Sequence, residues 1–148
     1  MLALDTDVLV AWSMDGAPHH TEVRVLVEGE LARRRGRIII VPRVVEEFLH
    51  IVTDRRRFYE PFSMKAAIAF VESILATRDV LCIAQQASVP ARMLELVAQH
   101  ALGRKRILDT ALVATLEAGG VRRLATFNGA DFVVFDSIEV VDPRERST

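Results

Sequence analysis

The chain has 148 residues, a length that suits one domain with a core buried on two sides, and no second domain is expected. Its 19 Lys and Arg residues are balanced by 20 Asp and Glu residues, which excludes an overall positive field, so any nucleic-acid binding must rest on local patches. Hydrophobic residues make up 51%, a proportion that either a sheet buried on both faces or an apolar partner surface explains.

The sequence carries no sign of export or membrane insertion. The single cysteine, Cys82, excludes an internal disulfide and a cysteine zinc cluster, and we expect a buried thiol in a reducing compartment. The first residues lack a basic region and are interrupted by Asp5 and Asp7, unlike a signal peptide. No apolar run approaches the ~20 residues that span a bilayer. We therefore expect a cytoplasmic protein that does not engage a membrane.

The first half of the chain alternates short apolar runs with amphipathic segments. In chain order, these predict a strand at 1–5, a helix at 7–12, a helix from about 18 to 35, a strand at 37–41 and a helix at 44–58. Thr6 or Asp7 is the expected cap of the first helix. The opening strand ends in Asp5, at the edge where open α/β sheets place their chemistry.

The second half continues the same alternation. In chain order, we expect a helix capped by Ser63, a strand at 80–83, helices at 90–102 and 108–118, a strand at 122–127, a turn at 128–131, a helical turn at 132–135 and a strand at 138–141. This order predicts an α/β fold, a three-layer α/β/α sandwich with a mostly parallel central sheet flanked by helices. Residues 1–143 would form this domain, and residues 144–148 a flexible tail.

Four carboxylates fall close to expected helix N-termini: Asp5, Glu47, Asp109 and Asp131. A helix dipole favours negative charge there, but neighbouring carboxylates raise one another's pKa, and a divalent cation would relieve that repulsion. Oxygen ligands suit Mg²⁺ or Mn²⁺. A cation held in this way can orient and polarise a phosphodiester, so we favour phosphodiester hydrolysis.

Each acid also has an ordinary structural explanation. Asp5, Asp7 and Asp109 would each serve as a helix cap, and Asp131 would stabilise its turn. Glu47 would be a surface acid of its helix. The prediction of a shared site therefore rests on the joint placement of the acids rather than on any one of them.

Four segments resemble, in order, the signature blocks of PIN-domain ribonucleases: LDTDVLV, VVEEFL, ILDTALVATLEAGGV and LATFNGADF. The resemblance extends from Leu2 to about Pro143. Within this family the chain looks most like the VapC toxins of toxin–antitoxin pairs. It implies a PIN-like fold and a metal-dependent endoribonuclease toxin that is neutralised by a cognate antitoxin and usually forms a homodimer.

The resemblance also implies roles for individual residues. The catalytic set would be Asp5, Glu47, Asp109 and Asp131, with the metal held by Asp5, Asp109 and Asp131, and with Asp7, Thr126 and Asn128 in support. Asp7 stands where the family commonly has Asn. Some relatives place the final acid at the position of Asn128, and Glu46 is a rival to Glu47.

Two basic clusters lie near these acids in the sequence. Arg55, Arg56 and Arg57 follow the helix that carries Glu47, and Arg104, Lys105 and Arg106 precede Asp109. Either cluster could bind RNA phosphates with strong salt dependence, and the alternative is a solvated helix end.

Two other functions compete with a ribonuclease. A response-regulator receiver would need an Asp after the third strand and a Lys after the fifth, and the sequence has neither. A catalytically inactive PIN-like module that binds RNA or protein is the second alternative, and retention of all four acids argues against it.

Overall fold

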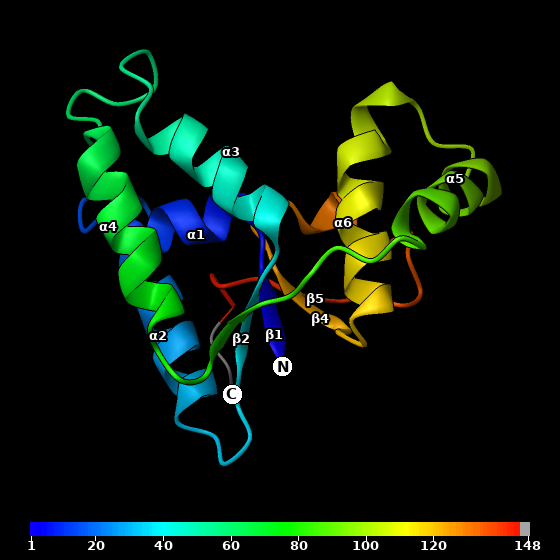
Figure 1. Cartoon of the computed structure of the whole chain (residues 1–148), viewed down its shortest axis with the longest axis horizontal. Helices are drawn as coiled ribbons and strands as arrows, with labels where there is room; N and C mark the ends of the chain where they lie inside the picture. The colour runs from blue at the N-terminus through cyan, green and yellow to red at the C-terminus, as the bar shows by residue number, and fades with distance from the viewer. Residues whose placement is uncertain (146–148) are drawn as a thin grey trace.

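The computed structural model describes residues 1–145, which contain a parallel sheet of five short strands at the centre of the fold (Figure 1). The strands run in the order β3-β2-β1-β4-β5 and comprise β1 (Leu2–Leu4), β2 (Ile38–Ile40), β3 (Val80–Cys82), β4 (Arg123–Ala125) and β5 (Glu139–Val141). In the central strand, Ala3 is paired with Ile39 on one side and with Leu124 on the other. Because all neighbours are parallel, the carboxyl ends of the strands meet at one edge.

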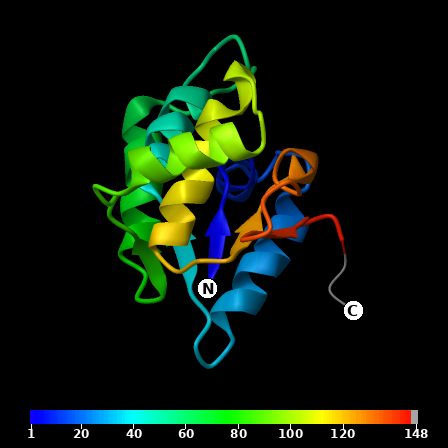
Figure 2. The same cartoon turned by 90° about the vertical axis from the view of Figure 1, so that its right-hand side faces the viewer.

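Helices cover both faces of this sheet. They comprise α1 (Thr6–Ser13), α2 (His20–Leu31), α3 (Pro42–Val52), α4 (Met64–Leu75), α5 (Val89–Gln99) and α6 (Ile107–Ala118), with short 3-10 helices η1 (Arg104–Arg106) and η2 (Gly129–Asp131). In Figure 1, α1, α2 and α4 lie on one side of the sheet and α5 and α6 on the other. Figure 2 views the molecule from the α5–α6 side. The predicted three-layer α/β/α sandwich is confirmed.

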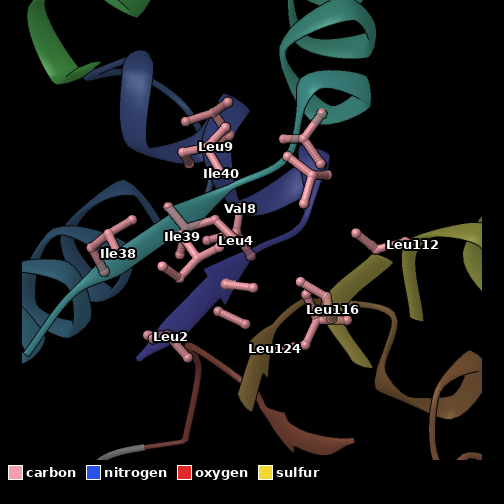
Figure 3. Packing of buried hydrophobic residues seen from close by; sticks show 14 of the residues in the cluster. Leu2, Leu4, Val8, Leu9, Ile38, Ile39, Ile40, Leu112, Leu116 and Leu124 are labelled. Carbon is pink, nitrogen blue, oxygen red and sulfur yellow. The ribbon is translucent and has the colours of Figure 1, made fainter. Parts of the chain in front are cut away.

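The central strands are apolar on both faces. Leu2, Leu4 and Ile38 are at most 1% exposed, as expected where helices cover a parallel sheet from both sides. Leu116 of α6 and Leu124 of β4 belong to the same core cluster (Figure 3). Each such buried side chain stabilises the fold by about 1.5–3 kcal/mol. The buried strand β1 therefore fixes the position of the backbone at Asp5, which follows it.

The helix predicted over 44–58 is too long, because α3 ends at Val52. The Asp54 side chain accepts a hydrogen bond from the backbone N–H of Arg56 at 2.8 Å, and the N–H of Phe62 donates to the carbonyl of Val52 at 2.8 Å. A side chain that bonds the backbone two residues on competes with helix continuation. The segment that carries Arg57 therefore forms a turn.

Smaller corrections concern other segments. The second helix starts at His20 rather than near Pro18, and residues 132–135 form hydrogen-bonded turns. Ser63 caps α4 through the N–H of Ala66, as predicted. The expectation of a buried Cys82 thiol is wrong, since this residue ends the edge strand β3 and is exposed.

The end of the described chain makes specific contacts. Arg144 bonds Asp142 and lies 5.7 Å from the ring centroid of Phe127. Residues 146–148 of the predicted tail lie outside the described part of the chain. Within residues 1–145, no helix is long and apolar enough to cross a membrane.

Truncation of a core leucine should measure the packing around the sheet. Leu116→Ala removes a fully buried side chain, and we expect it to lower the free energy of unfolding by about 2–5 kcal/mol. Leu94→Ala in α5 is the matched control, since Leu94 is 64% exposed and should change stability by less than about 0.5 kcal/mol. Urea denaturation of both variants tests this, and equal losses would contradict the assignment of the core.

Candidate active site

Asp5 leaves β1 at the carboxyl edge of the sheet and is held by two hydrogen bonds. Its Oδ1 accepts the backbone N–H of Thr6 at 2.7 Å, which makes Asp5, rather than Thr6 or Asp7, the cap of α1. Its Oδ2 accepts the hydroxyl of the fully buried Thr126 at 2.9 Å. The same Thr126 oxygen accepts the N–H of Asn128 at 3.1 Å. Residues at the ends of the neighbouring strands β1 and β4 therefore jointly orient this carboxylate.

Glu47 comes from the second turn of α3 and points toward Asp5. The hydroxyl of Thr6 donates to its Oε2 at 2.7 Å, and Arg43, one turn earlier on α3, donates to its Oε1. Pro42 occupies the first helical turn, where its missing N–H costs nothing. The rival Glu46 is exposed and lines a neighbouring cavity, away from Asp5.

Asp109 and Asp131 share one arginine. Arg106 ends η1, and its guanidinium lies 3.6 Å from a carboxylate oxygen of Asp109 and 3.5 Å from one of Asp131. The Asn128 amide also donates to Asp131. Among the described residues, the buried Nε and Nη2 atoms of Arg106 have no hydrogen-bond partner. The positive charge of Arg106 therefore lies between two carboxylates, although two of its donor nitrogens lack an acceptor.

Three of the predicted acids line one small cavity. Asp5, Glu47 and Asp109 lie around a space of about 20 Å³, with Arg43 in the same wall. That volume is enough for one water molecule or ion. Asp131 is not part of this lining and is connected to the others through Arg106. Residues far apart in sequence thus meet where β1, α3 and α6 come together.

Burial and mutual repulsion perturb the acids of this cavity. Burial raises the pKa of Asp5 above its usual range, and the charge of Glu47 adds to this against hydrogen bonds from Thr126 and Thr6. The pKa of Asp109 is raised by burial first, and then by the charges of Asp5 and Asp131. Negative charge at this edge of the sheet is therefore incompletely compensated.

Glu47 differs from the other two acids. Burial acts to raise its pKa, but hydrogen bonds from Arg43 and Thr6 outweigh that effect, so the pKa lies below its usual value. Glu47 is therefore ionised at neutral pH. A carboxylate that stays charged beside two acids that resist ionisation can accept a proton or a hydrogen bond from a water in the cavity.

Asp7 lies next to this group, on the first turn of α1. Its Oδ2 accepts the backbone N–H of Phe127 at 3.1 Å, whereas its buried Oδ1 has no partner among the described residues. Burial, followed by the charge of Asp5, raises the pKa of Asp7 to about 6. An unpartnered buried carboxylate oxygen is costly unless a cation or a proton satisfies it.

The chemistry of the donors suits a hard divalent cation. Carboxylate oxygens, raised pKa values and the unpartnered oxygen of Asp7 all indicate a deficit of positive charge. As they stand, however, no three His, Cys, Asp or Glu residues within 1–145 are arranged to enclose an ion. In this arrangement Glu47 is paired with Arg43, and Asp109 with Arg106.

The basic residues predicted from the sequence lie at different distances from the acids. Arg106 is among them, whereas Arg104 and Lys105 of η1 are exposed. Arg55 and Arg56 lie in the exposed turn after α3, where Arg56 pairs with Asp54.

Sequence reasoning missed Arg43. Its position four residues before Glu47, on the same face of a helix, was the available signal.

Comparison with known proteins identifies the family. The PIN domain profile matches residues 2–136, which is most of the chain. The chain belongs to the PIN domain family. No curated protein sequence matches the chain significantly.

Solved structures of toxins share the fold of this PIN domain. VapC20 of Mycobacterium tuberculosis, a sarcin-ricin loop cleaving toxin, aligns with a TM-score of 0.69 and 16% identity over 91% of this chain and 95% of that chain. A toxin–antitoxin complex from Klebsiella pneumoniae aligns with a TM-score of 0.64 and 17% identity, over 99% and 100% of the two chains. FitAcB of Neisseria gonorrhoeae aligns with a TM-score of 0.62 and 16% identity, over 97% of this chain and 98% of that chain.

The raised pKa of Asp7 predicts a pH-dependent stability. Because the folded protein favours the neutral form, ionisation of Asp7 lowers the free energy of unfolding as pH rises from about 4, where a free carboxyl titrates, to about 6. Asp7→Asn lacks this penalty, so it should be more stable than the wild type at pH 7, with a difference that shrinks as pH falls toward 4. Thermal denaturation with chelator at several pH values measures this.

The exposed Asp136→Asn is the control for Asp7→Asn and should follow the wild-type profile. If the stability difference between Asp7→Asn and the wild type does not vary between pH 4 and 7, the raised pKa is wrong.

Proposed function

We propose that this PIN domain is a metal-dependent endoribonuclease that hydrolyses RNA phosphodiester bonds. The observation that carries the proposal is the cavity where Asp5, Glu47 and Asp109 meet from three separate elements. A helix cap or a surface acid needs no such convergence. The raised pKa values of Asp5 and Asp109 support it, because perturbed carboxylates gathered in one cavity are typical of functional sites.

Asp5, Asp109 and Asp131 are the residues that would hold the cation, Mg²⁺ or Mn²⁺, with Asp7 and Asn128 in support. When bound, such an ion supplies activation of a water molecule and neutralises charge on a phosphodiester. Glu47 and Asp109 can contribute to this only by loosening their pairs with Arg43 and Arg106.

Glu47 orients the attacking water. Its carboxylate is ionised, and Thr6 fixes its position relative to Asp5. The water oxygen forms a bond to phosphorus as one P–O bond of the RNA backbone breaks, the water proton passes to a carboxylate, and the leaving ribose oxygen takes a proton from solvent. The Arg106 guanidinium lies beside Asp109 and Asp131, where its positive charge would offset negative charge on a phosphate bound at the site.

The remaining basic residues would contribute affinity for RNA that does not depend on the RNA sequence. Arg104 and Lys105 precede the helix that carries Asp109, and Arg55 and Arg56 follow the helix that carries Glu47. All four are exposed and would contact phosphates of the RNA backbone.

The biological role we propose is that of the toxin in a type II toxin–antitoxin pair. The VapC20 and Klebsiella pneumoniae neighbours, whose structures are of a toxin and of a toxin–antitoxin complex, support this role. Neutralisation would be by a cognate antitoxin, with the protein acting in the cytoplasm as a homodimer. A catalytically inactive PIN-like module that binds RNA or protein is the alternative, and the two are separated by a cleavage assay.

Removal of the Asp5 carboxylate tests catalysis. Asp5→Asn keeps the shape of the side chain and its Thr6 contact, but removes a charge from the cation site, so Mg²⁺- or Mn²⁺-dependent cleavage of single-stranded RNA should fall more than about 100-fold. The matched control is Asp136→Asn, an exposed acid outside the site, which should cleave like the wild type. Circular dichroism checks that both variants fold. Full cleavage by folded Asp5→Asn would refute the catalytic assignment.

Expression in a bacterial host tests the toxin role separately. The wild-type protein should arrest growth, because cleavage of cellular RNA stops translation, and Asp5→Asn should not. Co-expression of the product of a small neighbouring open reading frame should restore growth. Growth arrest by both forms would show that toxicity does not depend on this site.

A further inference from the structure

A second and larger cavity adjoins the acidic one. It has a volume of about 530 Å³ and shares Asp5 with the small cavity. From Asp5 it extends past Asp7 to Arg57 and Phe58 in the turn after α3, and Asn128 lies on its other side. A volume of this size accommodates a small organic group rather than a single ion.

The turn that carries Arg57 and Phe58 is well defined. The backbone N–H groups of both residues donate to the carbonyl of Asp54, at 3.1 and 3.2 Å. Phe58 is half-buried, and part of it lines the cavity. Within residues 1–145, no other aromatic ring pairs with it. The turn thus places an unpaired aromatic side chain in the wall of the cavity.

Arg57 supplies the positive charge of this cavity. It is 59% exposed, and its nearest carboxylate, on Asp54, lies 3.8 Å away, beyond hydrogen-bond distance. Its guanidinium donors are therefore available to an incoming anion. Asp5 and Asp7 line the same cavity and, without a bound cation, would repel an anion placed beside them.

These features together select one kind of occupant. An uncharged planar ring stacks on Phe58, the apolar wall formed by Val10 and Ile51 excludes water from its edge, and a linked phosphate meets Arg57. The base of a nucleotide, attached to its phosphate, has this combination. An acidic peptide side chain does not, since it offers an anion to Arg57 but no planar ring to Phe58.

We infer that the cavity between Asp5 and Phe58 binds the base of the RNA nucleotide next to the cleaved phosphate, with Phe58 stacking on the base and Arg57 contacting the following phosphate. This rests on the proposed ribonuclease function. Because the cavity opens directly from Asp5, the base concerned is an immediate neighbour of the cleaved bond, and Phe58 is a residue that determines where the enzyme cuts.

Abasic substitution in the substrate tests the inference with wild-type protein. A short single-stranded RNA that the enzyme cuts is prepared with the base removed at one position at a time. Loss of the base at one position adjacent to the cleaved bond should lower kcat/KM by about tenfold, because stacking on an aromatic side chain contributes that order of affinity. Equal cleavage of all these RNAs overturns the inference and leaves the proposed function intact.

A variant of the ring completes the test. Phe58→Leu should lower kcat/KM on the intact RNA by about tenfold and show no further loss on the abasic RNA, whereas Phe58→Trp should restore the preference. Tyr59→Leu is the matched control, since Tyr59 is the next aromatic, fully exposed and outside the cavity lining. An equal loss in Tyr59→Leu, or an additive loss in Phe58→Leu, contradicts the assignment.

A binding measurement separates this inference from catalysis. Asp5→Asn protein should bind the intact RNA more tightly than the abasic RNA, and Asp5→Asn combined with Arg57→Gln should bind both more weakly, with a shallower salt dependence. Equal affinities of the Asp5→Asn protein for the two RNAs would overturn the base subsite. Absence of cleavage by the wild type, with this preference in binding retained, would overturn only the proposed catalysis.

Discussion

Complete burial of the two central strands is the constraint on which the rest of the molecule depends. β1 and β2 lie between two layers of helices and expose almost nothing to solvent, so no charged side chain fits along their length. The polar side chains of the site therefore come from residues beyond the strand ends: Glu47 and Asp109 from helices, and Asp5 directly after β1. Thr126 directly follows β4, one hydrogen bond from Asp5. The position of the site is thus a consequence of an apolar sheet.

The same edge concentrates more negative charge than proteins usually tolerate without a cation. Two arginines of the chain partly neutralise this charge: Arg43 pairs with Glu47, and Arg106 lies between Asp109 and Asp131. These guanidinium groups stabilise the folded protein when no other cation is present. Arg106 would also compete with a divalent ion, because Asp109 and Asp131 are among the residues proposed to hold one. Weaker pairing of Arg106 with these two acids would therefore favour binding of the metal.

Much of the fold follows from the sequence because local signals and the global architecture agree. Asp5 and Glu47 could be placed at the sheet edge, since an apolar strand precedes one and a helical stripe flanks the other. Cys82 could not be judged correctly, because its exposure depends on β3 being an edge strand, and strand order is not a local property. The early end of α3 is favoured by a hydrogen bond that the Asp54 side chain accepts from the backbone N–H of Arg56, which the apolar spacing of the helix does not reveal. The roles of Arg43 and Phe58 depend on such tertiary detail.

The acids of the site and the residues proposed to bind the RNA base lie on separate parts of the chain. Asp5 is held by β1 and by its hydrogen bond from Thr126. Arg57 and Phe58 lie in the solvent-facing connection between α3 and α4, which contains no strand and contributes little to the core. Substitutions or changes of length in that connection leave the acids where they are. Altering these loop positions therefore changes what the larger cavity beside Asp5 can bind, at small cost to folding.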